Sequence, residues 1–187
     1  MKKLLIAALV AVFAVSAFTL AGCGGDTDTA RKYMKEADTA YEALDKQLSE
    51  LASSSTALVT AALQGNVSAI TPEDLTRLAG MVGTFEPEIA GVKDLYATIV
   101  PLKGVEDYVA YAKAMMKALD AESAMVAVGG AFLAQLEPYL KSGDVAGLSK
   151  KIEQSTAEII KTQGMQTTTD EAYAAAKKIK KDKNLGQ

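Results

Sequence analysis

The chain's single thiol belongs to Cys23, and its 187 residues contain no histidine to pair with it. Histidine is the commonest general base and the commonest metal ligand, so Cys–His and Ser–His catalytic pairs are excluded. One cysteine also cannot form an intramolecular disulfide, a zinc knuckle or a Cys-x-x-Cys redox pair. Di-iron sites in helical proteins need Glu-x-x-His pairs, which are absent from this sequence. We therefore expect no metal site, no cofactor and no catalytic residue, and treat carboxylate-only catalysis as a remote alternative.

The segment ahead of Cys23 has the charge pattern of an exported or membrane-inserted chain. Lys2 and Lys3 give a short positive start, and no charged residue occurs between Leu4 and Gly22. About 20 apolar residues are needed to cross a bilayer, and this stretch of 19 residues nearly reaches that length. A secretory signal, whose apolar part ends in small residues at a cleavage site, has the same pattern. The segment by itself is consistent with an uncleaved span or with a cleaved leader.

The residues around the thiol favour the cleaved leader. The run Leu20-Ala21-Gly22-Cys23 resembles the lipobox of bacterial lipoproteins, which reads Leu, a small residue, Gly or Ala, and then Cys. The resemblance covers residues 1–23 and implies that a signal peptidase recognises Leu20, Ala21 and Gly22. It also implies that Cys23 becomes the first residue of the mature chain and carries covalent diacylglycerol, with a further acyl chain on its amino group as an option. Two or three acyl chains hold a protein stably, whereas one holds it only marginally.

This resemblance predicts an extracytoplasmic protein anchored by lipid to the cell membrane or the outer membrane. In the family, Asp after the Cys favours inner-membrane retention, and Gly24 leaves the outer membrane open in a two-membrane host. Removal of residues 1–22 changes the net charge from −3 to −5 because it removes two lysines. An acidic chain with pI near 5.1 is not expected to bind nucleic acid. We assign residues 1–22 to the signal peptide, 23–27 to a lipidated tether, 28–182 to a helical domain and 183–187 to a C-terminal tail.

Beyond the tether, apolar residues recur every three or four positions, as in helices that pack together or form coiled coils. A first helix of about 36 residues follows cap residues at 27–29 and is closed by Gly and Asn at 65–66. A second helix begins with the cap sequence at 71–74. It continues, kinked, through Pro87, because the stripe of apolar residues along one helix face keeps the same spacing on both sides of the proline. A third runs from about Val105 to Leu140.

The fourth predicted helix begins at Asp144, and its pattern weakens near Gly164. Residues 167–170 resemble a new capping box, so this part is either one flawed helix or two helices in succession. Strand signals are nearly absent from the sequence. Four long amphipathic helices with short connections predict an all-α fold, an antiparallel up-down-up-down four-helix bundle.

Two features of the third helix leave alternatives open. Glu122 occupies a position where the helix face should be apolar, so it lies either at the bundle edge or inside, as a buried polar contact or a ligand-binding group. The segment 124–134 has no polar side chain and is too short to span a bilayer. It is either buried all round, with glycines that allow close helix approach, or a self-association surface, or an apolar ligand pocket. The pocket would be formed by Met125, Gly129, Gly130 and Phe132.

Five lysines close to the C-terminus complete the candidate residues: Lys177, Lys178, Lys180, Lys181 and Lys183. Cations near a helix C-terminus complement its macrodipole, which is one explanation for them. The other is contact with lipid headgroups, because an antiparallel four-helix chain ends on the side where it began, next to Cys23. Taken together, the sequence predicts a non-catalytic, lipid-anchored bundle that binds a protein partner, acts as a scaffold or contacts the envelope. The alternative is a carrier or sensor of a small apolar ligand. The oligomeric state is left open.

Overall fold

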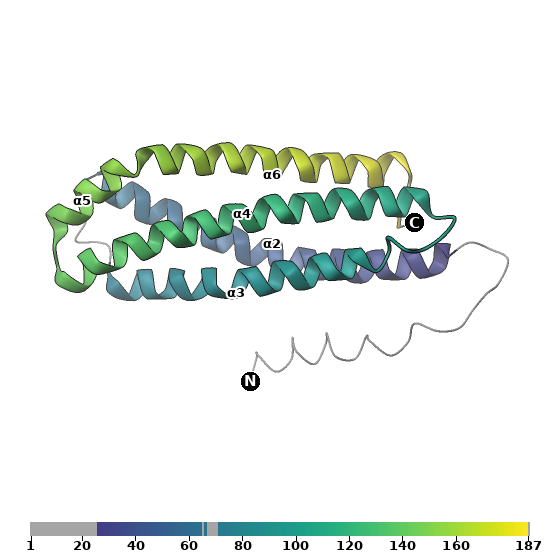
Figure 1. The fold of residues 1–187 in the computed structure, drawn as a ribbon, viewed down its shortest axis with the longest axis horizontal. Helices are drawn as coiled ribbons and strands as arrows, with labels where there is room; N and C mark the ends of the chain where they lie inside the picture. Colours follow the sequence, from purple (N-terminus) through teal and green to yellow (C-terminus); the bar gives the residue numbers. More distant parts are fainter. Residues whose placement is uncertain (1–25, 65, 67–70, 187) are drawn as a thin grey trace, which may run out of the picture.

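A computed structural model describes residues 26–64, 66 and 71–186, and every regular element in these residues is an α-helix (Figure 1). The predicted signal peptide, Cys23 and the predicted closing residue Gly65 lie outside the described residues. The all-α prediction is therefore confirmed for the described part of the chain. Its helices are α2 (Thr27–Leu63), α3 (Pro72–Ala97), α4 (Glu106–Ser142), α5 (Val145–Gln154) and α6 (Thr156–Asp182).

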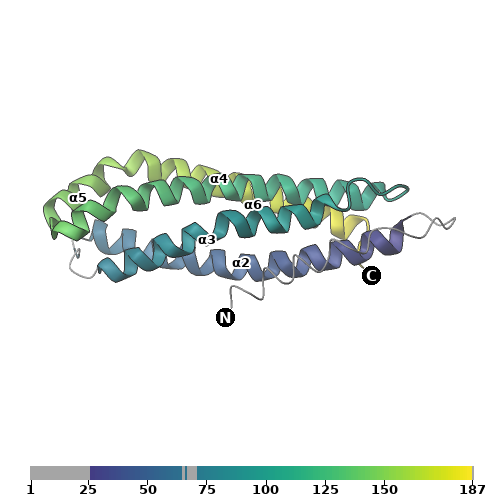
Figure 2. The same cartoon turned by 60° about the horizontal axis from the view of Figure 1, so that its bottom comes forward.

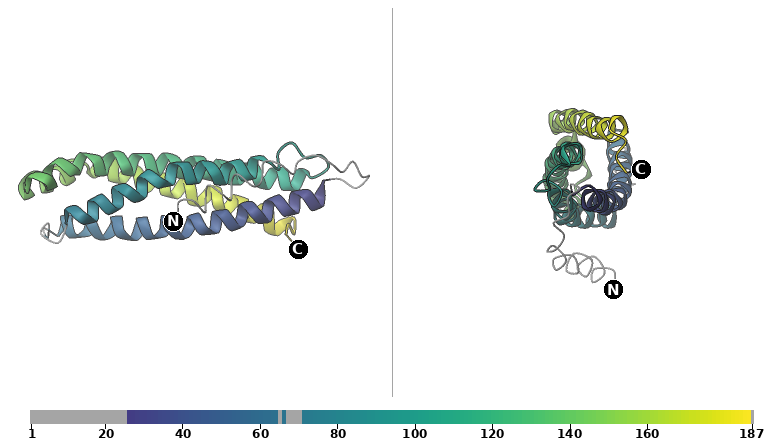
Figure 3. Two further views of the ribbon diagram at one scale, coloured as in Figure 1. Left: turned by 90° about the horizontal axis from the view of Figure 1, so that it is seen from below. Right: turned by 90° about the vertical axis from the view of Figure 1, so that its right-hand side faces the viewer.

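The four long helices lie alongside one another as a bundle, and the short α5 sits at one end of it (Figure 2). Helix α3 packs against α2 and α4, and α4 packs in turn against α6. The end-on view in Figure 3 shows these helices surrounding a shared interior. Among the described residues, no helix has an apolar stretch long enough to cross a bilayer.

The apolar stripes predicted from the sequence form this interior. Their buried members merge into one main cluster over the four long helices, and a smaller cluster lies where α3, α4 and α5 meet. Six apolar positions of the predicted stripes lie outside the described side chains: Leu58, Ala62, Leu75, Leu140, Val145 and Ile159. The buried stripe residues include Met34, Leu44, Leu48, Leu78, Phe85, Ile89, Val92, Tyr96, Ile99, Val105, Tyr108, Ala112, Met115, Leu119, Val126, Leu133, Leu136, Leu148 and Ile152.

The helix starts that the sequence marked most clearly are confirmed. The Thr71 hydroxyl accepts a hydrogen bond from the backbone N–H of Asp74 at 3.1 Å, at the start of α3. The Asp144 carboxylate accepts one from the N–H of Gly147 at 2.9 Å and caps α5. Helix α3 continues through Pro87, as its unbroken stripe predicted.

The fourth segment forms two helices in succession, but they meet at Ser155 and not near Gly164. The predicted second start at residues 167–170 is wrong, because α6 runs uninterrupted through it. The hydroxyls of Thr168 and Thr169 donate to the carbonyls of Gly164 and Met165, at 3.1 and 3.0 Å. These threonines therefore bond to the preceding turn of their own helix and cap nothing.

Both ends of the described chain lie at the same end of the bundle. The N–H of Asp26 donates to the Lys103 carbonyl at 3.3 Å, and the Asp26 carboxylate accepts from the Lys103 N–H at 3.0 Å. Leu185 is buried in the core, and a Cβ on Gly186 would lie 3.1 Å from Cε of Met34. We call residues 26–36, 98–110 and 177–186 the terminal end.

Candidate functional site

Asp38 of α2 accepts hydrogen bonds from each of the other three long helices. The hydroxyls of Tyr96 (α3) and Tyr111 (α4) donate to its Oδ1 at 2.6 and 2.7 Å. The ammonium of Lys180 (α6) donates to its Oδ2 at 2.6 Å, and the Asp38 side chain is only 14% exposed. One polar side chain from every long helix thus meets at a single carboxylate.

The two tyrosines of this cluster are held in their neutral form. Burial, followed by the neighbouring Tyr111 and Asp38, raises the pKa of Tyr96 far above its ordinary value. Burial and then Asp38 likewise raise the pKa of Tyr111. The two rings pack edge to face with centroids 5.9 Å apart, and the Lys180 ammonium lies 5.9 Å from the Tyr111 centroid. Because both hydroxyls keep their protons, they remain hydrogen-bond donors and tie α3 and α4 to α2.

Glu122 forms a second interior polar contact. It is 6% exposed, and the hydroxyl of Tyr173 donates to its Oε2 at 2.5 Å. The rings of Tyr173 and Tyr41 lie 4.9 Å apart, which brings α2 into the same layer. Burial raises the pKa of Glu122, and the bond from Tyr173 opposes that rise. The interpretation that placed Glu122 at the bundle edge is therefore wrong, and the alternative of a buried polar contact is correct.

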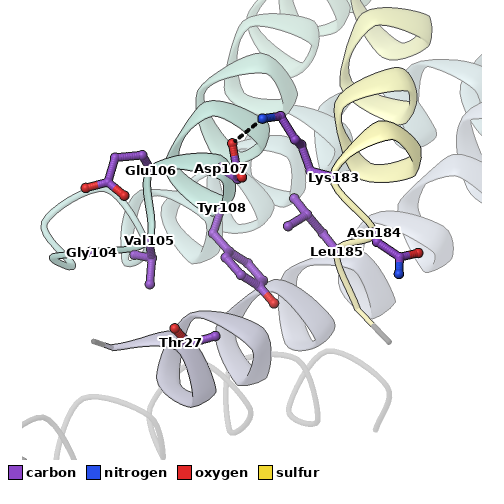
Figure 4. Close-up of a pocket in the computed structure, with 9 residues that line it drawn as sticks. All are labelled: Thr27, Gly104, Val105, Glu106, Asp107, Tyr108, Lys183, Asn184 and Leu185. Carbon is purple, nitrogen blue, oxygen red and sulfur yellow. Dashed lines mark ion pairs between the residues drawn. The ribbon is translucent and has the colours of Figure 1, made fainter. Parts of the chain in front are cut away.

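A polar pocket of about 220 Å³ opens at the terminal end, between the start of α2, the start of α4 and the residues after α6 (Figure 4). Asp107 and Lys183 form an ion pair at 3.1 Å beside it, and both side chains are about half exposed. No pattern in the sequence predicted this pocket, because its members come from three distant segments. They are Thr27, Gly104, Val105, Glu106, Asp107, Tyr108, Lys183, Asn184 and Leu185.

The five lysines proposed from the sequence divide into two groups. Lys180 and Lys183 are engaged in ion pairs with acids of α2 and α4. Lys177, Lys178 and Lys181 are exposed on the last turns of α6. The lysines thus lie at the terminal end, and two of them also hold helices together.

The candidate apolar segment, residues 124–134, lies in the half of α4 that is remote from the pocket at the terminal end. Met125, Gly129, Gly130 and Phe132 are all half-buried. A Cβ on Gly130 would lie 2.6 Å from Cγ1 of Val82, so α4 approaches α3 closely at this point. A Cβ on Gly129, by contrast, would meet no heavy atom within 4 Å.

Sequence reasoning missed Asp38, although a signal for its cluster exists. The chain has seven tyrosines and no tryptophan, and several of the tyrosines occupy stripe positions. A buried tyrosine hydroxyl usually finds a hydrogen-bond partner, so tyrosines in the stripes imply polar groups facing the interior. Asp38 adjoins the stripe residue Ala37 and resembles the many acids on exposed helix faces, so its position alone did not identify it.

Comparisons with known proteins give no relative for this fold. No family model, curated protein or solved structure was found to match the chain. Within the described residues, no group of three or more cysteine or acidic side chains is arranged to hold a metal ion.

Proposed function

We propose that the protein is a lipid-anchored lipoprotein that acts outside the cytoplasm as a non-catalytic binding or scaffolding bundle. The observation that carries this proposal is the lipobox-like run Leu20-Ala21-Gly22-Cys23 behind the positive start at Lys2 and Lys3. In this proposal Cys23 carries diacylglycerol and, after cleavage of residues 1–22, is the first residue of the mature protein. The membrane is then its first partner.

The proposed architecture is an antiparallel up-down-up-down bundle in which α5 and α6 together form the fourth rod. Support comes from the contacts at the terminal end, where Asp26 bonds to Lys103 and Gly186 lies against Met34. An even number of antiparallel rods returns the chain to its starting end, and these contacts are what such an arrangement would produce. The tether that follows Cys23 would therefore emerge beside the C-terminus.

A scaffold is favoured over a carrier of an apolar ligand by the way the interior is filled. The close approach of Gly130 to Val82 occupies space that a ligand pocket in this segment would need. The partly buried carboxylate of Asp38 and the buried carboxylate of Glu122 accept hydrogen bonds from neighbouring helices of the protein itself. This arrangement supports a structural role for both acids and is the reason we propose no catalytic residue.

The lipidation is tested by expressing the full chain in a bacterial host and measuring the mass of its N-terminal peptide. We expect a chain that begins at Cys23 and carries diacylglycerol, and that partitions into the detergent phase. The Cys23→Ala variant should keep its leader and carry no lipid, whereas Thr19→Ala, just outside the lipobox, should behave like the natural chain. An unmodified Cys23 thiol on a protein that retains residues 1–22 would overturn the proposal.

A further inference from the structure

We propose that the bundle stands upright on an anionic bilayer, with its terminal end against the phospholipid headgroups and its α5 end held away from them. This inference rests on the proposed lipidation of Cys23. It adds an interaction surface, a ligand chemistry and an orientation that the anchor alone does not dictate, because a lipid tether by itself lets a rod lie flat.

The proposed tether between Cys23 and the bundle is short. Asp26 is fixed to the α3–α4 connection by two hydrogen bonds to Lys103, at 3.3 and 3.0 Å. Cys23 precedes Asp26 by three residues, and an extended chain spans at most about 3.6 Å per residue. The lipid would therefore be attached within about 11 Å of the terminal end.

Charge is unevenly distributed between the terminal end and the rest of the bundle. The terminal end contains nine basic and six acidic residues, a net charge of +3. The remaining segments, 37–97 and 111–176, contain nine basic and seventeen acidic residues, a net charge of −8. Lys177, Lys178 and Lys181 contribute to the positive end and are exposed there. The folded protein is thus positive at one end and negative along the rest of its length.

The reach of the tether and the range of headgroup attraction are similar. The Debye length is about 8–10 Å at physiological ionic strength, which is close to the reach of the tether. Headgroup phosphates would therefore attract the terminal end, and a bundle lying flat would bring its acidic sides against an anionic surface. Helix α4 has 37 residues, or about 55 Å at 1.5 Å per residue. An upright bundle would hold α5 about that far from the bilayer.

The orientation can be measured with single tryptophans, because the chain contains none. Ala110 and Ala146 are exposed alanines near opposite ends of the bundle, so Ala110→Trp and Ala146→Trp give matched donors. Energy transfer to an acceptor on lipid headgroups is measured for the lipidated protein in phosphatidylglycerol vesicles. We expect transfer from Ala110→Trp to exceed that from Ala146→Trp at least fivefold. Equal transfer from the two positions would overturn the upright orientation.

A charge-reversed variant tests whether headgroup attraction is responsible. Lys177→Glu/Lys178→Glu/Lys181→Glu changes the terminal end from +3 to −3 and leaves the ion pairs of Lys180 and Lys183 in place. We expect the transfer ratio to fall towards one, as it should for the natural chain in 1 M salt, where the Debye length is about 3 Å. The control Lys46→Glu/Lys117→Glu/Lys150→Glu reverses three exposed lysines elsewhere and should keep the ratio. A ratio unchanged by reversal of Lys177, Lys178 and Lys181 would exclude the headgroup contact.

A second preparation separates this inference from the proposed lipidation. The mature chain from Cys23 onward has one thiol, which can be coupled to a maleimide-bearing lipid in the same vesicles. If cell-derived protein has an unmodified Cys23, the proposed function fails, while the coupled chain still reports whether the bundle stands. If Cys23 is lipidated in cells and the coupled chain lies flat, the orientation fails and the proposed anchor is retained.

Discussion

The ammonium of Lys180 lies 2.6 Å from the carboxylate of Asp38, although 142 positions separate the two residues in the chain. This contact joins the last long helix to the first, and the hydroxyls of Tyr96 and Tyr111 bring the other two helices to the same carboxylate. The pair is only partly buried, with 40% of the Lys180 side chain and 14% of the Asp38 side chain exposed, but loss of the carboxylate would leave three donors without their common acceptor. The cluster is therefore a sensitive point for the assembly of the whole bundle.

The Asp38→Asn variant should unfold more easily than the natural chain. The substitution removes the negative charge that accepts three hydrogen bonds, and bonds to charged groups each contribute about 1.5–3 kcal/mol. We expect the free energy of unfolding to fall by about 2–3 kcal/mol, measured by urea denaturation followed by circular dichroism. Asp28→Asn makes the same chemical change at an exposed position of α2 and should have little effect. Equal losses in the two variants would contradict a special role for Asp38.

The Glu122→Gln variant should be more stable than the natural chain at neutral pH but not at pH 4. Burial raises the pKa of Glu122, so the folded protein holds a proton where the unfolded chain has released it. Stability should therefore fall as pH rises from about 4.3, the ordinary pKa of Glu, to the raised folded value, and then level off. Gln stays neutral and can still accept from Tyr173, so it removes this fall. Melting temperatures at the two pH values test this, and a larger loss for Glu122→Gln at pH 7 than at pH 4 would refute it.

The bundle should lose stability as pH rises above about 10, the ordinary pKa of tyrosine. Burial is the leading cause that raises the pKa of Tyr41, Tyr96, Tyr111 and Tyr173. The unfolded chain then releases protons that the folded protein retains, which favours unfolding. We expect tyrosinate absorbance from these four residues to appear together with the loss of helical circular dichroism. Their ionisation while the helices remain intact would contradict the burial of these hydroxyls.

Two adjacent glycines of α4 should respond in opposite ways to alanine. Gly130→Ala places a methyl group 2.6 Å from Cγ1 of Val82, and overpacking typically costs about 1–3 kcal/mol. Gly129→Ala meets no heavy atom within 4 Å and should gain about 0.5–1 kcal/mol from helix propensity. Thermal unfolding of the two variants checks these signs. Adding Val82→Ala should reduce the cost of Gly130→Ala, and its failure to do so would show that the close approach lies elsewhere.

Much of the helical structure follows from local sequence rules. The stripes predicted the buried faces because one helical face must be apolar to pack against its neighbours. Thr71 and Asp144 were predicted as caps because their side-chain oxygens can accept from N–H groups that the helix leaves unpaired. The passage of α3 through Pro87 was predicted from the register of the stripe on both sides.

The failures occur where tertiary contacts decide the outcome. The boundary at Ser155 has no glycine or proline to mark it, and although Ser155 and Glu158 have the spacing of a capping box, Ser155 makes no side-chain cap bond to α6. Asp38 and Glu122 could be placed only once the tyrosines of other helices were known to face them. The terminal-end pocket depends on three segments that no periodicity relates.

The location of Asp26 and Gly186 at the same end of the bundle has a practical consequence for protein engineering. A short linker could connect these two positions, and new termini could be opened at Gly143, in the left-handed turn between α4 and α5. The resulting permutant would retain the same core but attach to a surface by its opposite pole. Comparing this permutant with the natural chain would show whether the protein's interactions depend on which end of the bundle faces away from the surface.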